Sequence, residues 1–143
     1  MRTSIPNGLR TVFLINFIFA VIFGLSGTFA ARLVGNIAGH PVRDVDVNML
    51  MGVAALAFAI GSWFAYRATS WEQISIVTAM EGFFNLVGGI GGLVAYFVPS
   101  ILGVDSLPPV QLVVAIVLTV LGIAFAYFYL QANRALQPAL KSL

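Results

Sequence analysis

The sequence predicts an all-α fold, an integral membrane four-helix bundle in which one domain, residues 1–143, crosses the bilayer up-down-up-down. Composition is the first observation: 60% of the residues are hydrophobic and 8% are charged, against roughly 45–50% and 25% in soluble domains. So few charges cannot cover a surface exposed to water. The second observation is that four apolar runs each reach the length of about 20 helical residues that crosses a bilayer.

The predicted spans cover about residues 11–33, 47–66, 74–98 and 110–130. Backbone groups in lipid must be satisfied within their own segment, so these runs are expected to be helices. Two overlapping capping boxes within residues 69–73 begin the third span and leave a very short turn, which makes the second and third spans antiparallel neighbours. Pro99 ends the third span, and Pro108-Pro109 begins the fourth.

Basic residues in the flanks predict the orientation. One side of the membrane would hold five of them and the other side two. Both termini are therefore expected in the cytoplasm. The five are Arg2, Arg10, Arg67, Arg134 and Lys141, and the two are Arg32 and Arg43.

A weak internal similarity recurs at an offset of 61 residues. Phe64-Ala65-Tyr66 matches Phe125-Ala126-Tyr127, and Gly27 matches Gly88. One interpretation is a tandem repeat of two helical hairpins, as in some transporters. The alternative is the composition that membrane spans share, and the sequence leaves both open.

Glu81 is the most informative residue, because it lies about ten residues, or roughly 15 Å, into the third span. A charge near the bilayer centre costs about 3 kcal/mol on insertion scales and usually faces the interior of a bundle. Helical spacing places Thr78, Glu81, Asn85, Gly88 and Gly92 on one stripe. Its Gly88-x-x-x-Gly92 half is typical of close helix packing in membranes.

The first span carries a similar stripe with Asn16 and, nearer its end, Gly27. We therefore predict that the first and third spans face each other and bring Asn16, Thr78, Glu81 and Asn85 into one buried polar cluster. Thr119 of the fourth span is a further candidate. The second and fourth spans are expected to supply mostly apolar wall.

Three explanations of Glu81 remain open. In the first explanation, Glu81 is a binding site in a cavity for a cation, a proton or the amine of a ligand. Alternatively, it is a protonated hydrogen-bonding group that holds helices together, or it pairs with a partner chain. No lysine, arginine or histidine lies deep within a predicted span to neutralise it.

Other site classes find little support. His40, Asp44 and Asp46 lack the spacing of metal ligands, so we predict no metal site and no cofactor. The scattered basic residues make no nucleic-acid surface. The 143 residues contain no cysteine and no recognisable catalytic set.

The stretch from Arg43 to Tyr66, with Met49-Leu50-Met51-Gly52-Val53-Ala54-Ala55-Leu56, resembles the small four-span bacterial membrane proteins described as DoxX-like. That resemblance implies a bacterial inner membrane and transfers no catalytic residue.

The leading hypothesis is a non-enzymatic membrane protein that binds or passes a small solute, cation or proton at Glu81, alone or as a homo-oligomer. One alternative is an accessory subunit of a larger membrane complex that offers the glycine-rich face of the third span to a partner. A membrane enzyme that acts on a lipid or quinone is the second alternative.

Overall fold

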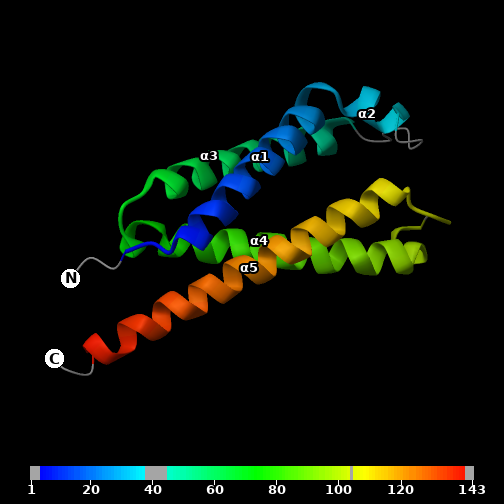
Figure 1. The fold of residues 1–143 in the computed structure, drawn as a ribbon. Coiled ribbons are helices and arrows are strands. Elements are labelled where there is room, and N and C mark those ends of the chain that lie inside the picture. The colour runs from blue at the N-terminus through cyan, green and yellow to red at the C-terminus, as the bar shows by residue number, and fades with distance from the viewer. Residues whose placement is uncertain (1–3, 38–44, 104, 141–143) are drawn as a thin grey trace.

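The computed structural model describes residues 4–37, 45–103 and 105–140, and within these it confirms the all-α fold (Figure 1). Four of its helices are long and apolar enough to cross a membrane, as the sequence predicts. In chain order the helices are α1 (Asn7–Phe29), α2 (Ala31–Ile37), α3 (Val45–Arg67), α4 (Trp71–Phe97), the 3-10 helix η1 (Pro99–Leu102) and α5 (Pro109–Leu140).

The first predicted span is two helices rather than one. α1 ends at Phe29, Ala30 departs from helical geometry (φ −130°, ψ 20°), and α2 continues in another direction (Figure 1). Position 30 holds neither glycine nor proline, so no helix-breaking residue announces this break in the sequence. With 23 residues, α1 alone still has the length of a span.

The other helix ends lie close to the predictions, with one extension. α4 begins after the predicted cap, where Gln73 Oε1 accepts the backbone N–H groups of Thr69 (3.1 Å) and Ser70 (3.3 Å). α5 continues ten residues past the predicted end at 130, to Leu140. An apolar run measures the membrane-crossing part of a helix, whereas the residues that follow, among them the good helix formers Ala132, Arg134 and Leu136, prolong the helix itself.

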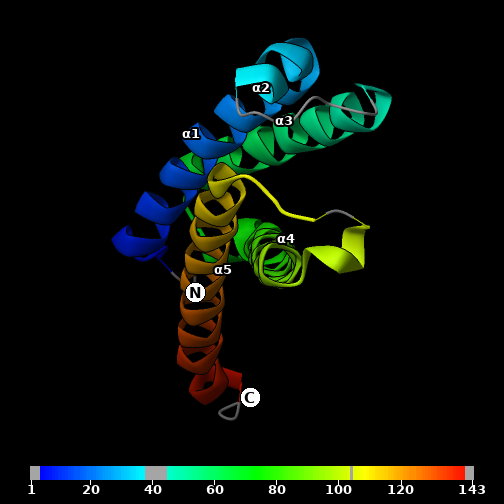
Figure 2. The same ribbon diagram turned by 90° about the vertical axis from the view of Figure 1, so that its right-hand side faces the viewer.

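The helices pair as two hairpins, α1 with α3 and α4 with α5 (Figure 2). The predicted packing of the first span against the third is therefore wrong for the backbones, because α1 lies against α3 and not against α4. Glycines explain the pairing. A Cβ on Gly27 of α1 would lie 3.1 Å from Cα of Gly52 in α3, and a Cβ on Gly89 of α4 would overlap the backbone of Thr119 in α5.

The two hairpins do not cross at equivalent positions. An offset of 61 residues would place the counterpart of the Gly27–Gly52 contact at Gly88 and Val113. The second hairpin instead brings Gly89 against Thr119 and Gly122 against Leu86. The pairing of neighbours agrees with a tandem repeat, but the register of the contacts does not add support for it.

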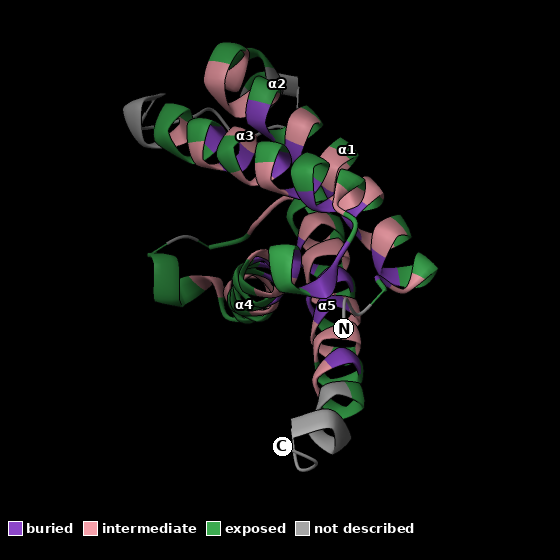
Figure 3. Cartoon of the chain, turned by 90° about the vertical axis from the view of Figure 1, so that its left-hand side faces the viewer, coloured by how far each residue is buried: buried purple, intermediate pink, exposed green. Residues whose placement is uncertain are grey.

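The hairpins meet at the end that carries the α3–α4 turn and both described chain ends, which we call the closed end; the opposite end, with α2 and η1, is the open end (Figure 1). All four spanning helices contribute to the apolar core of the closed end (Figure 3). Phe13 and Phe125 meet edge to face there, with 5.0 Å between ring centroids. The Arg10 guanidinium donates to the backbone oxygens of Tyr66 (2.9 Å) and Ala68 (2.8 Å). The buried core residues are Ile5, Leu9, Phe13, Ala65, Trp71, Ile74, Phe125 and Ala132.

Two glycines of α4 provide a matched test of this packing. We expect Gly89→Ala to lower the thermal unfolding temperature of the purified protein in detergent, because the new methyl group would overlap the Thr119 backbone. Gly91→Ala, in the same helix, is the control: a methyl group at position 91 would meet no atom within 4 Å, so we expect this variant to be neutral or stabilising. Equal unfolding temperatures for the two variants would contradict the α4–α5 contact.

Candidate functional site

A layer of polar side chains lies next to the apolar core of the closed end; it begins about one helical turn beyond the core on α1, α3 and α4 and continues along α4 to Asn85. The layer consists of Asn16 of α1, Ser62 of α3, and Thr78, Glu81 and Asn85 of α4, and each is at most 3% exposed. Buried polar groups are costly unless they are hydrogen-bonded. The hydrogen bonds among these side chains therefore determine which chemical role the layer can have.

The hydrogen bonds of the layer converge on the Glu81 carboxyl group. Ser62 Oγ donates to Oε1 (2.8 Å), and Asn16 Nδ2 donates to Oε2 (2.9 Å). The same Asn16 nitrogen donates to Ser62 Oγ (2.9 Å). Asn85 Nδ2 donates to Asn16 Oδ1 (3.2 Å) and to the backbone oxygen of Glu81 (2.8 Å). Both carboxyl oxygens thus accept hydrogen bonds from neutral groups, an arrangement suited to a carboxylate.

Three of the four predicted cluster residues are brought together, and one is not. Asn16, Glu81 and Asn85 form one network across α1 and α4, although the backbones of these helices do not pack together. Thr78 is fully buried, but its hydroxyl donates to the Ile74 backbone oxygen of its own helix. Thr119 likewise donates to the Ala115 backbone oxygen and is not part of the network.

Ser62 is the member of the network that was not predicted from the sequence. It comes from the second span, which was expected to be mostly apolar wall. It is the only serine or threonine within residues 47–66, and that isolation is the signal by which it could have been found. Through Ser62 the carboxyl group of Glu81 joins α3 to α1 and α4.

A cavity of about 260 Å³ lies between the two hairpins and is lined by all four spanning helices. Asn16, Glu81 and Asn85 border it on the side of the closed end, and Gln111 of α5 borders it toward the open end. The rest of the lining is apolar and includes four phenylalanines, Phe19, Phe23, Phe58 and Phe84. The cavity therefore combines one acidic group with a largely apolar wall that carries four aromatic rings.

Among the residues that the structure describes, no basic side chain lies near Glu81. In the described part of the chain, the arginines are Arg10, Arg32, Arg67 and Arg134, and all lie toward helix ends. Arg10 already binds two backbone oxygens at the α3–α4 turn. Within the described residues, a negative charge on Glu81 would therefore be stabilised by hydrogen bonds and not by an ion pair.

The predicted packing glycines contact helices of the same chain. A Cβ on Gly92 would lie 2.9 Å from Cβ of Ala115, and one on Gly88 would lie 3.7 Å from Leu118 Cδ1, both in α5. Gly88 also borders the cavity. Gly89 is thus buried against α5 and Gly92 is partly covered by it, whereas Gly88 and Gly91 stay exposed, so the use of this face by a partner subunit stays a hypothesis.

The outer-loop residues weighed as metal ligands include two, His40 and Asp44, that lie outside the described residues. The absence of a metal site in that loop stays a prediction.

Comparison with models of known protein families, with curated proteins and with solved structures finds no match to this chain. The function is therefore inferred from the geometry of the polar layer and its cavity.

Asn16 should be the residue of the layer whose loss most weakens the fold. Asn16→Leu keeps the approximate volume but removes two donated bonds and one accepted bond. At about 0.6 kcal/mol for each interhelical bond, we expect a loss of about 2 kcal/mol in the free energy of unfolding, measured by SDS titration in mixed micelles.

Ser26→Ala is the control for Asn16→Leu, because the exposed Ser26 hydroxyl bonds only the Ile22 backbone oxygen of its own helix. It should leave the free energy of unfolding almost unchanged. The network would not stabilise the bundle if both variants unfolded at the same SDS fraction.

Proposed function

We propose that this multi-pass membrane protein binds a small organic cation of the protonated-amine type at Glu81, in the cavity between the two hairpins. The observation that carries the proposal is a buried carboxyl group that accepts hydrogen bonds at both oxygens, borders a cavity and has only neutral hydrogen-bonding partners. Ionisable residues inside membrane spans commonly mark binding sites or ion pathways.

The lining of the cavity favours an organic cation over a metal ion. One carboxylate balances a single positive charge, and Ca²⁺ takes six to eight oxygen ligands. Here the wall is mostly apolar and includes four phenylalanines, of which Phe58 and Phe84 stack with 4.3 Å between ring centroids. An aromatic face attracts an ammonium group by about 0.5–2 kcal/mol and also accommodates an apolar body.

The size of the cavity limits the ligand. Sites for drug-sized molecules have volumes of roughly 300–1,000 Å³, and this one has about 260 Å³. It suits a cation with a single ring or a short branched chain.

The distribution of basic residues supports an orientation with both termini in the cytoplasm. The cavity would then open away from the cytoplasm, at the end with α2 and η1. The DoxX-like pattern of residues 43–66 supports a bacterial inner membrane. The hydrogen bonds of Glu81 also suit a purely structural role, so the test must separate binding from folding.

Benzyltrimethylammonium, a permanent cation with one ring, is a suitable probe. We expect it to bind the purified protein in micelles, and Glu81→Gln to weaken binding by at least about tenfold, equivalent to about 1.4 kcal/mol. The amide keeps an acceptor for Ser62 or Asn16 and retains the fold, which the unfolding transition would verify. Isothermal titration calorimetry measures the affinity.

Glu72→Gln is the matched control, because Glu72 lies in the first turn of the same helix and does not line the cavity. The Glu72→Gln variant should bind benzyltrimethylammonium with the same affinity as the unchanged protein. Tight binding by Glu81→Gln, or no binding by the unchanged protein, would leave only the structural role.

The affinity for the permanent cation should fall as the pH falls. A proton on Glu81 removes the charge that attracts the ligand, while the probe keeps its own charge at every pH. The side chains that line the cavity from α1, α3, α4 and α5 include no second titratable group. Titrations at a series of pH values should therefore show the dependence in the unchanged protein and not in Glu81→Gln; a dependence shared by both would exclude Glu81 as its source.

A further inference from the structure

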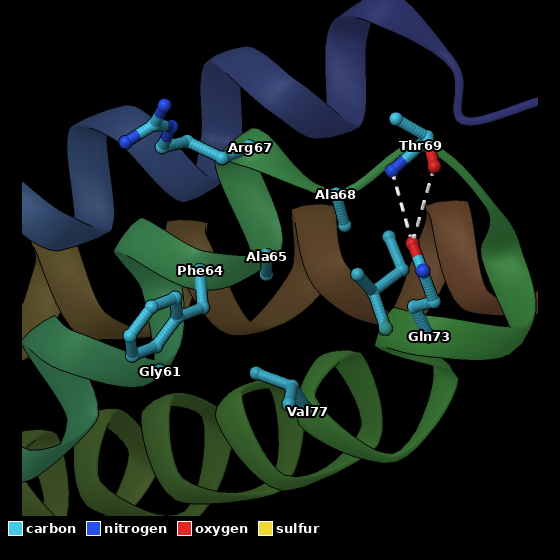
Figure 4. A pocket seen from close by; sticks show the side chains of 9 residues that line it. Gly61, Phe64, Ala65, Arg67, Ala68, Thr69, Gln73 and Val77 are labelled. Carbon is cyan, nitrogen blue, oxygen red and sulfur yellow. Dashed lines mark hydrogen bonds between the residues drawn. The ribbon is translucent and has the colours of Figure 1, made fainter.

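A second set of cavities follows the groove between α3 and α4 and begins at the closed end. The first has a volume of about 590 Å³ and lies beside the α3–α4 turn (Figure 4). Arg67, Thr69 and Gln73 line it near the turn, and Gln73 is held there by its bonds to Thr69. Gly61 of α3 and Val77 of α4 line its inner part.

A smaller crevice of about 200 Å³ connects this groove with Glu81. Gly61 and Val77 border both the groove and the crevice. Phe58 and Glu81 border both the crevice and the cavity between the hairpins. Consecutive cavities therefore share lining residues, and Glu81 lies where the last two adjoin.

The three cavities follow one another along both helices. On α4 the lining advances from Gln73 to Val77, then to Glu81, and finally to Gly88. On α3 it runs in the opposite chain direction, from Arg67 past Gly61 to Met51. This order extends over most of both helices, from the closed end toward the open end.

The apolar core of the closed end explains why the route follows α3 and α4. Leu9, Phe13 and Phe125 are fully buried and fill the space between α1 and α5. The groove passes beside this core, and at Gly61 no side chain occupies it. A Cβ there would lie 3.7 Å from Val77 Cγ1 and 3.9 Å from Glu81 Oε1, so a methyl group fits and a longer side chain would fill the crevice.

We propose that the α3–α4 groove is a second access route to Glu81, opposite in direction to the cavity between the hairpins, and that Gly61 sets its width. This inference rests on the proposed function and extends it from binding to passage. The bound organic cation reaches Glu81 from one membrane face through the inter-hairpin cavity and leaves toward the other face along the groove. No covalent step is involved.

The absence of cysteine from the 143 residues permits a direct test by single-cysteine labelling in sealed vesicles of both orientations. The probe is a membrane-impermeant trimethylammonium methanethiosulfonate. We expect Val77→Cys to react from the face that carries the chain termini and Leu118→Cys, which lines the inter-hairpin cavity, to react from the other face. Ile76→Cys, 74% exposed on the outer surface of α4, is the control and should not react within lipid.

Substitution at Gly61 tests passage separately from binding. In liposomes, Gly61→Leu should reduce benzyltrimethylammonium uptake by at least about tenfold, while the affinity in micelles changes by less than about twofold, because the inter-hairpin cavity stays open. Gly61→Ala should keep most of the uptake. Val77→Phe, which fills the groove from the opposite wall, is the second variant in case Gly61→Leu misfolds.

The outcomes separate this inference from the proposed function. Failure of the unchanged protein to bind the probe would refute the proposed function and, with it, this route. Normal binding with undiminished uptake in Gly61→Leu and Val77→Phe would overturn the route alone. The route would also be overturned if Val77→Cys reacted only from the face from which Leu118→Cys reacts. A loss of both binding and uptake in Gly61→Leu and in Val77→Phe would overturn it as well.

Discussion

The hydrogen bonds that Ser62 and Asn16 donate to Glu81 are the interaction on which the arrangement of the hairpins depends. Placing an acidic group deep in a span costs about 3 kcal/mol, and these two bonds offset part of that cost. They also connect the α1–α3 hairpin to α4 of the other hairpin at a depth where the backbones of α1 and α4 do not pack. The apolar core joins the two hairpins at the closed end, and the hydrogen-bonded carboxyl group of Glu81 joins them in the adjacent polar layer.

Beyond that layer, side-chain size separates the hairpins. Within each pair, small residues let the backbones approach, as Gly27 and Gly52 do in the first hairpin. Between the pairs, the stacked rings of Phe58 and Phe84 occupy the facing surfaces. Glycines inside the hairpins therefore hold the helices of each pair together, and phenylalanines between the pairs border a cavity that the two hairpins enclose. The cavity and its acidic group follow from this pattern.

The sequence sufficed for the four spanning helices and for most of the polar network, but not for the break at Ala30 or for the pairing of the helices. Apolar length determines spans, and a lone Glu81 with Asn85 one turn away indicates a buried face, so both were predictable. Periodicity assigns faces to a helix without saying which helix covers them. Gly88 and Gly92 thus predicted a face for close helix packing. That α5 is the helix nearest to this face follows only from the three-dimensional structure. Ser62 escaped notice because one hydroxyl in an apolar span gives no periodic pattern.

The surroundings of Glu81 argue for more than a structural bond. A carboxyl group that only joins helices is best enclosed by packed side chains, since a water-sized void beside it loses contacts and gains nothing. Glu81 instead borders a cavity on each side, although it is only 1% exposed. One of these cavities is bordered by Gly61, where the space would accept a methyl group. An open space beside an acidic group at mid-span is what the proposed passage of a cation requires, and this is the feature of the structure that supports it.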